Sequence, residues 1–216
     1  ALPGTVMLAG TALVFTLLYA LPAGIISAVN RNKWVDYVLR SLSFVGVSMP
    51  SFWLGLVLIY IFGLKLGLVP IATSRITPIG VILPAATLAV VIGSKYMRQV
   101  RLVILEEMEK DYVIGARARG VSEMKILFGH ILPNAVLPLI TILGVVMGWL
   151  LGGVAVVEMV FSWPGLGNMA VYAITMRDYP LIEGFVLWVA LAYMCINALI
   201  DASYVLLDPR LKRERA

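Results

Sequence analysis

Long uncharged apolar stretches, separated by short charged segments, make up most of the chain. A membrane-spanning helix needs about 20 consecutive, mostly apolar residues, whereas a strand of a membrane barrel is about 10 residues of alternating polarity. The stretches here are continuous and long, so the pattern predicts an all-α polytopic membrane bundle. Five windows qualify as spans, and we expect prolines to delay the start of the third: Gly4–Val29, Ser41–Leu64, Ile76–Ser94, Ile131–Val157 and Glu183–Leu207.

The composition also indicates a lipid environment. The 216 residues are 61% hydrophobic and 13% charged, whereas soluble domains carry about 25% charged residues. A soluble domain of this size could not bury so much apolar surface. The net charge is +5, but the bases lie between apolar stretches, so we expect a lipid bilayer and no nucleic acid as a partner. No linker or repeat divides the sequence, and residues 1–216 are predicted to form one transmembrane domain.

The positions of the basic residues predict the orientation of the spans. Most of the 17 lysines and arginines lie in residues 30–40, residues 95–130 and the C-terminal tail, and five spans place these segments on one side. Basic loops stay in the cytoplasm, so the C-terminus is predicted to be cytoplasmic and Ala1 external. Because Ala1 begins an apolar stretch without a charged signal region, we expect an upstream span to be missing.

The segment Lys95–His130 is longer and more mixed in charge than orientation requires. Apolar residues recur at helical spacing from Met97 to Met108, and glycines then interrupt the pattern before a second short helix, Glu123–Gly129. A helix, a break and a second helix exposed to the cytosol suit docking into a groove on another protein. A solvated helical loop without a partner is the alternative.

Two other connections contain structure of their own. Asn30–Arg40 is amphipathic and is predicted to be an elbow helix at the membrane interface, or else a plain turn. Glu158–Ile182 is predicted to be external, with a turn at Trp163–Gly165 and a short helix at Asn168–Met176. It caps an outer vestibule or packs as a surface loop on neighbouring spans.

Polar groups in or beside the spans are candidates for lining a substrate path, because a charge at mid-bilayer costs about 2.5–3.5 kcal/mol. Asn197 and Asp201 share a helix face near the inner end of the last span. Glu158 and Glu183 are expected near outer ends, where water reaches them. The alternative role for these groups is packing between helices through hydrogen bonds.

The sequence lacks the motifs of an enzyme. It has no glycine-rich phosphate loop, so we expect no ATP binding by that route. It also has no cluster of residues at metal-ligand spacing and no paired catalytic groups. The single histidine, His130, and the single cysteine, Cys195, are interpreted as structural residues. We therefore predict no cofactor and no metal in this chain.

Four blocks of sequence resemble the permease subunits of ABC importers, in the branch that transports dipeptides, oligopeptides or nickel. DYVIGARARG, Asp111–Gly120, resembles the DYV…ARA(K/R)G loop of that branch. It departs from the general signature, because Ile114 stands at the glutamate position, Gly115 at an alanine position and His130 at the isoleucine position. The other blocks follow in the family's order: SMPSFWLGL at 48–56, VVEMVFSWPGLG at 156–167 with MRDYPLIEG at 176–184, and LLDPRLK at 206–212.

The resemblance implies a six-span subunit whose first span is missing here. It also implies cytosolic ABC ATPase subunits that bind ATP and magnesium, a second homologous permease and an extracytoplasmic solute-binding protein, which would dock over residues 158–182. The loop would couple ATP hydrolysis to the spans. The coupling residues would be Gly115, Ala116, Arg117, Ala118, Arg119, Gly120, Ser122, Glu123 and Lys125, in which small residues permit close approach and charged ones contact the ATPase.

The function expected from the resemblance is ATP-driven import of dipeptides or oligopeptides across the inner membrane, by a subunit that is not itself an enzyme. Nickel or another small solute is the alternative within the same class. A transporter that works without ATP is a different class, which matched broken helices in two halves would favour. We see no such internal symmetry in the sequence.

Overall fold

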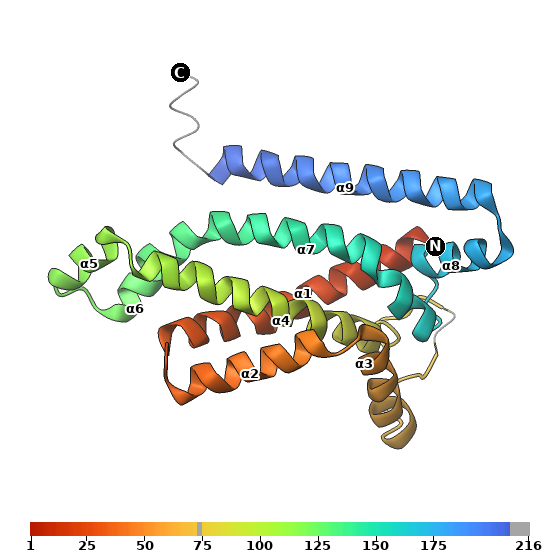
Figure 1. The fold of residues 1–216 in the computed structure, drawn as a ribbon, viewed down its shortest axis with the longest axis horizontal. Helices are drawn as coiled ribbons and strands as arrows, with labels where there is room; N and C mark the ends of the chain where they lie inside the picture. Colours follow the sequence, from red (N-terminus) through yellow and green to blue (C-terminus); the bar gives the residue numbers. More distant parts are fainter. Residues whose placement is uncertain (73–74, 208–216) are drawn as a thin grey trace.

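All regular structure in the described part of the chain is helical. The computed structural model describes residues 1–72 and 75–207 (Figure 1). The elements are α1 (Leu2–Val29), α2 (Trp34–Ser48), α3 (Ser51–Leu58), the π-helical segment η1 (Ile59–Lys65), α4 (Ile82–Met108), α5 (Asp111–Ala118), α6 (Glu123–Ile126), the π-helical segment η2 (Leu127–Ile131), α7 (Leu132–Val160), α8 (Leu166–Met176) and α9 (Tyr179–Leu207). The predicted fold class is confirmed.

Three described stretches are long and apolar enough to cross a membrane: Leu2–Val29, Glu123–Gly148 and Tyr179–Ala202. The pair α2 and α3–η1 makes a fourth if it is counted as one span, but it is bent by 101°. The prediction of one helix over Ser41–Leu64 is therefore wrong. Met49 is extended, with ψ of 125°, because Pro50 disfavours helical geometry in the residue before it.

The helix α4 joins a predicted span to the predicted cytoplasmic helix. It begins at Ile82, six residues after the expected start of the third span, and continues without a break to Met108. Its uncharged part ends at Ser94, so the half that follows belongs to the charged segment. The uncharged N-terminal half of α4 and its charged C-terminal half form one continuous helix.

Two other boundaries differ from the prediction. The expected elbow at Asn30–Arg40 is a short turn followed by α2, which runs on from Trp34 to Ser48. The expected helix Glu123–Gly129 does not end at Gly129, because α6 passes through η2 into α7. The short helix expected at Asn168–Met176 is confirmed, since α8 covers residues 166–176, and its external location stays a prediction.

The helix α4 is the centre of the bundle and contacts α1, α2, α3 and α7. Small residues permit the closest approaches: a Cβ on Gly93 of α4 would clash with the Tyr19 ring of α1, and one on Gly24 of α1 would clash with Val100 of α4. The Tyr19 hydroxyl donates to the backbone carbonyls of Ala89 and Val90, each at 3.0 Å. The helices α1 and α4 are therefore locked together along their length.

The helix α9 lies on the outside of the bundle against α7 (Figure 1). The glycines at 144 and 148 of α7 face Ile200 and Tyr193 of α9. The α1–α2 turn, α5 and α6 lie at one end of the bundle, and Ala1 and α8 lie at the other (Figure 1). The predicted cytoplasmic segments at 30–40 and 95–130 thus share one end, while the basic tail lies outside the described residues.

Candidate functional site

The predicted coupling residues form a compact bracket at one end of the bundle, made of α5, residues 119–122 and α6. We call this the α5–α6 bracket. Val113 and Ala116 of α5 and Ile126 of α6 are buried in one apolar cluster with Val100 and Ile104 of α4. Because these apolar side chains share a core, we expect the bracket to move together with the charged half of α4 rather than as a loose loop.

Gly120 ends α5 in a geometry that favours glycine. Its φ is +77°, in the left-handed region where other residues are strained. The Gly120 backbone N–H donates to the Arg117 carbonyl at 2.9 Å, and the Val121 N–H donates to the Ala116 carbonyl at 3.2 Å. These two bonds are the Schellman pattern, which satisfies the last carbonyls of a helix and reverses the chain.

Two charged residues of the bracket pair with each other across this reversal. The Arg117 guanidinium donates to both carboxylate oxygens of Glu123, at 2.7 and 3.0 Å. This bidentate pairing holds the pKa of the Glu123 carboxyl below its usual range. We expected both residues to contact a partner, and that stays a prediction. Within this chain they pair with each other, and they are exposed, as are Arg119 and Lys125.

The remaining predicted coupling residues line the same turn. Ala118, Gly120 and Ser122 are exposed, and Gly115 is half-buried. A Cβ on Gly115 would meet the Arg119 guanidinium at an ordinary 3.4 Å, so packing within the chain does not require glycine there. The small residues therefore leave an open surface on the outer side of the bracket.

The bracket and the η2 segment that follows it also expose large apolar side chains that sequence reasoning missed. Ile114, Met124 and Phe128 are 55%, 65% and 60% exposed. Met124 and Phe128 are four residues apart and so share a helix face, while Ile126 points into the core. The helical spacing of Met124 and Phe128 was the signal in the sequence that could have revealed this surface, because Met and aromatic side chains are enriched at protein contact surfaces.

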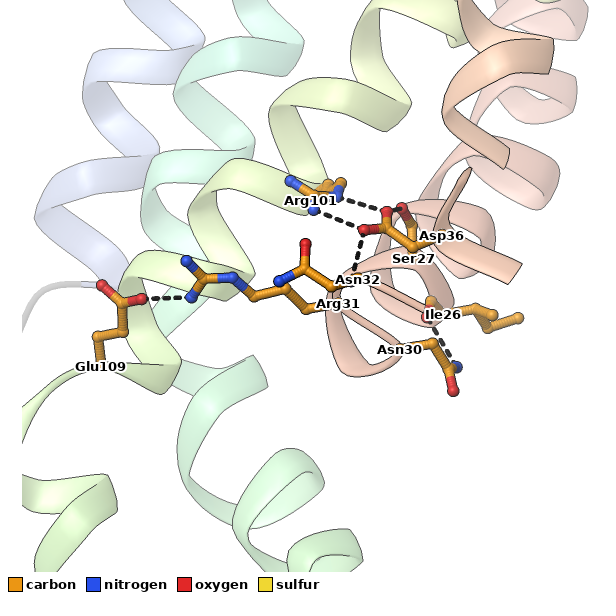
Figure 2. A network of polar contacts seen from close by, with 8 residues as sticks. All are labelled: Ile26, Ser27, Asn30, Arg31, Asn32, Asp36, Arg101 and Glu109. Carbon is orange, nitrogen blue, oxygen red and sulfur yellow. Dashed lines mark hydrogen bonds and ion pairs between the residues drawn. The ribbon is translucent and has the colours of Figure 1, made fainter. Parts of the chain in front are cut away.

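A buried ion pair fastens the α1–α2 corner to the charged half of α4 (Figure 2). The Arg101 guanidinium donates to both carboxylate oxygens of Asp36, each at 2.8 Å. The Ser27 hydroxyl and the Asn32 backbone N–H also donate to this carboxylate, at 2.6 and 3.0 Å. Asp36 is completely buried, so its charge depends on these four bonds.

Two further acids hold the end of α4. Arg31 pairs with Glu109 at 2.5 Å near the surface (Figure 2). Glu107 is buried and accepts from Lys110 at 2.5 Å and from the Tyr112 hydroxyl at 2.7 Å. Burial and the adjacent carboxylate raise the pKa of Tyr112 to about 12, so Tyr112 remains a hydrogen-bond donor at physiological pH. These contacts fix the angle between α4 and α5.

The candidates for lining a path are not brought together. Glu158 is on α7 and completely buried, so the expectation that water reaches it is wrong. Glu183 and Asp201 are exposed on α9, and Asn197 is half-buried on the same helix. Their role in a substrate path stays a prediction.

The burial of Glu158 follows from a network between the ends of three helices. The Thr5 hydroxyl of α1 donates to Glu158 Oε1 at 2.6 Å, and the Asn168 backbone N–H of α8 donates to Oε2 at 3.0 Å. Gly165 precedes α8 and has no side chain to cap it, so the Glu158 carboxylate supplies the cap. A Cβ on Gly165 would lie 1.9 Å from Glu158 Oε1.

A tryptophan completes this junction between helix ends. Trp163 is completely buried, and its indole Nε1–H donates to the Gly4 carbonyl of α1 at 2.9 Å. The Leu166 backbone N–H donates to the Thr5 hydroxyl at 2.7 Å. The residues between 158 and 168 therefore bind α1, α7 and α8 into one unit.

Among the described residues, no group of three His, Cys, Asp or Glu side chains is placed to hold a metal ion.

Comparison with known proteins gives one consistent family. Residues 20–213 match the family model described as the binding-protein-dependent transport system inner membrane component. The chain is 38% identical over 208 residues to the glutathione transport system permease protein GsiC of Escherichia coli strain K12. This match covers 96% of this chain and 68% of that protein. The same values hold for the protein of that name from Shigella dysenteriae serotype 1.

Solved structures share the fold at low sequence identity. A chain of the MetNI methionine ABC transporter in an inward-facing conformation matches with a TM-score of 0.79 at 19% identity, over 95% of this chain and 93% of that one. An amino acid ABC transporter structure matches with a TM-score of 0.69 at 19% identity, over 93% of this chain and 89% of that one. The helical arrangement is therefore that of ABC importer permeases.

Proposed function

Since the chain belongs to the family of binding-protein-dependent transport system inner membrane components, we propose that its substrates are dipeptides or other short peptides. The protein is a permease subunit of an ABC importer and a multi-pass membrane protein. The relatives of 38% identity are named as glutathione permeases, and glutathione is itself a short peptide. That likeness supports a small peptide rather than a metal ion as the cargo.

The observation that carries the mechanism is the attachment of the α5–α6 bracket to α4. The bracket presents exposed Ile114 and Met124 with Arg119 and Lys125, and exposed Phe128 follows it in η2. The inner side of the bracket shares a core with α4. A cytosolic ATPase that holds the bracket would therefore move α4 directly. Alternating access by rigid-body motion follows from such a linkage.

The assembly that we propose has the partners expected from the sequence. Cytosolic ATPase subunits bind ATP and magnesium and hold the α5–α6 bracket, a second permease forms the other wall of the path, and a solute-binding protein docks over the α8 end. The C-terminal tail is cytoplasmic, on the same side as the bracket. This chain translocates the substrate and catalyses no reaction itself.

ATP-driven uptake by the complete reconstituted complex tests the proposal. Proteoliposomes with both permeases, the ATPases and the binding protein should accumulate a labelled dipeptide only when ATP and the binding protein are present. A non-hydrolysable ATP analogue is the control. Equal uptake without ATP would identify a secondary transporter, and ATP-driven uptake of nickel but not peptides would overturn the substrate assignment.

A further inference from the structure

The contact between α2 and α4 marks the level at which charged sequence begins. Gly46 of α2 packs so closely on α4 that a Cβ there would clash with the Ser94 side chain. Ser94 is the last residue of the uncharged part of α4, and the rest of α2 and all of α3 beyond Gly46 carry no charge. In a multi-pass membrane protein such a boundary lies near the lipid headgroups. The start of α2 and the charged half of α4 therefore lie beside the headgroups.

Two guanidinium groups at this level have no acidic partner. Arg40 of α2 lies 6.0 Å from the Tyr37 ring, and Arg98 of α4 lies 5.1 Å from the Phe44 ring. Among the described residues neither arginine forms an ion pair, whereas the neighbouring Arg101 pairs with an acid of α2. Both unpaired arginines are half-buried, so their charges are partly withdrawn from water without an anion to offset the cost.

The two unpaired charges gather on one face of α2. Tyr37, Arg40 and Phe44 recur at intervals of three and four residues, so they lie along the same side of the helix. Arg40 precedes Phe44 by about one helical turn, and Arg98 lies against the Phe44 ring from α4. An anion on this face would therefore meet two planar donors, each able to form two parallel hydrogen bonds.

An open groove of about 570 Å³ begins at Phe44 and continues toward the uncharged end of α2. Met49, Phe52 and Trp53 line its far part, where α3 bends away from α2 by 101° (Figure 1). Ser48 also lines the groove, but its hydroxyl already donates to the Phe44 backbone carbonyl at 2.8 Å. The groove thus has cations at the end where Phe44 lies and an apolar or aromatic lining along the rest of its length.

We propose that Arg40 and Arg98 bind the headgroup of an anionic phospholipid whose acyl chain lies in the groove between Phe44 and Trp53. Basic pockets between membrane helices are typical sites for acidic headgroups. The helix rises about 12 Å from Arg40 to Ser48, which is most of the ~15 Å hydrocarbon depth of one leaflet. The lining suits an acyl chain rather than a peptide, whose backbone needs hydrogen-bond partners. The proposal does not depend on the transported substrate.

Native mass spectrometry of the complete, delipidated complex tests this inference by counting the lipids that bind. Phosphatidylglycerol is the anionic probe and phosphatidylcholine the zwitterionic one. Arg40→Gln and Arg98→Gln should each lower the affinity for phosphatidylglycerol about tenfold and change that for phosphatidylcholine by less than about twofold. Arg31→Gln is the matched control, because it removes a charge at the same end of the bundle that already pairs with Glu109. It should keep the wild-type affinity for both lipids.

A further variant tests the groove separately from the headgroup contacts. Val45 lines the groove and is 50% exposed, so Val45→Trp fills the groove without entering the core. It should lower the binding of phosphatidylglycerol while both guanidinium groups remain. Glycerophosphoglycerol, which is the headgroup without acyl chains, should not displace the lipid. Displacement by this compound at equal concentration would identify a simple anion site and overturn the inference.

The remaining outcomes are equally decisive. Unchanged affinity for phosphatidylglycerol in Arg40→Gln and Arg98→Gln, or an equal loss in Arg31→Gln, would overturn the inference. Loss of the proposed second permease from the variant complexes, visible in the same spectra, would assign this face of α2 to that subunit instead. None of these results bears on the proposed peptide transport, which is tested by uptake.

Discussion

At the scale of single residues, Glu158 shows how one side chain holds the ends of three helices. Glu158 is on α7, and its carboxylate accepts hydrogen bonds from the Thr5 hydroxyl of α1 and from the Asn168 backbone N–H at the start of α8. Glu158 is completely buried, so these donors must offset the free-energy cost of burying its carboxylate. The absence of a side chain at Gly165 makes room for it.

Gly165→Ala should therefore destabilise the protein by about 1–3 kcal/mol, because the new Cβ forces the Glu158 carboxylate away from its donors. Gly10→Ala is the matched control, since a Cβ there meets nothing within 4 Å among the described residues. Thermal unfolding in detergent should show a lower midpoint for Gly165→Ala and no loss for Gly10→Ala. Equal midpoints for the two variants would show that the network does not hold the junction.

The position of Glu158 illustrates what the sequence could predict about single residues. Its place near the end of a span followed from hydropathy, but its burial did not. Thr5, its hydrogen-bond donor, is 153 residues away in the sequence. Long-range contacts of this kind leave no local pattern, and for the same reason the pairing of Asp36 with Arg101 was not predicted.

At the scale of elements, the α5–α6 bracket depends on a single left-handed residue. Gly120 has φ of +77° and supplies one of the two bonds that close α5. Asparagine tolerates this conformation, whereas a β-branched residue does not, at a cost of about 1–2 kcal/mol. A Cβ at Gly120 meets no other group of the described chain within 4 Å, so the strain is in the backbone alone.

We therefore predict that Gly120→Val reduces substrate-stimulated ATP hydrolysis by the reconstituted complex more than Gly120→Asn does. Gly120→Arg, which adds bulk at the contact surface, should abolish the stimulation while the protein still inserts into the membrane. The rate of phosphate release with and without loaded binding protein measures the effect. Full stimulation in Gly120→Val and Gly120→Arg would contradict a coupling role for the bracket.

The clamp between α2 and α4 gives a second prediction at this scale. Arg101→Ala leaves the buried Asp36 carboxylate without its cation and should cost about 3–5 kcal/mol. Arg31→Ala breaks an ion pair whose side chains are 53% and 67% exposed, and should cost less than about 1 kcal/mol. Denaturant unfolding of the solubilised protein measures both.

A double variant separates pairing from packing in this clamp. Asp36→Asn with Arg101→Gln removes both charges, so it should destabilise less than the sum of the two single changes. Additive losses would mean that Asp36 and Arg101 act independently, and the clamp would then not link the corner to α4.

At the scale of the whole molecule, the apolar stretches predicted the helical bundle. The basic segments between them predicted which connections lie at the same end of it. Hydropathy works here because a backbone in lipid must satisfy its own hydrogen bonds. It could not reveal that Pro50 breaks a span with a bend of 101°, or that α4 runs unbroken from apolar to charged sequence. Those features depend on local backbone geometry and on packing against α1.

The same limits applied to the candidate site. The loop that resembles the permease signature identified the α5–α6 bracket. The helical spacing of the apolar residues in this loop predicted which of its sides is buried. Arg117 and Glu123 pair with each other within the chain, and their contacts with a partner stay a prediction. The exposed Met124 and Phe128 are further candidates for direct contact with the proposed ATPase.

Chemical cross-linking at Met124 tests the central claim most directly. Cys195 is the only cysteine in the sequence, so Met124→Cys in a Cys195→Ser background places one thiol on the bracket. Arg177→Cys at the α8 end is the matched control. With a thiol-to-amine reagent in the assembled complex, we predict a cross-link from position 124 to the ATPase and none from position 177. No ATPase adduct at position 124, or an equal one at position 177, would contradict the account.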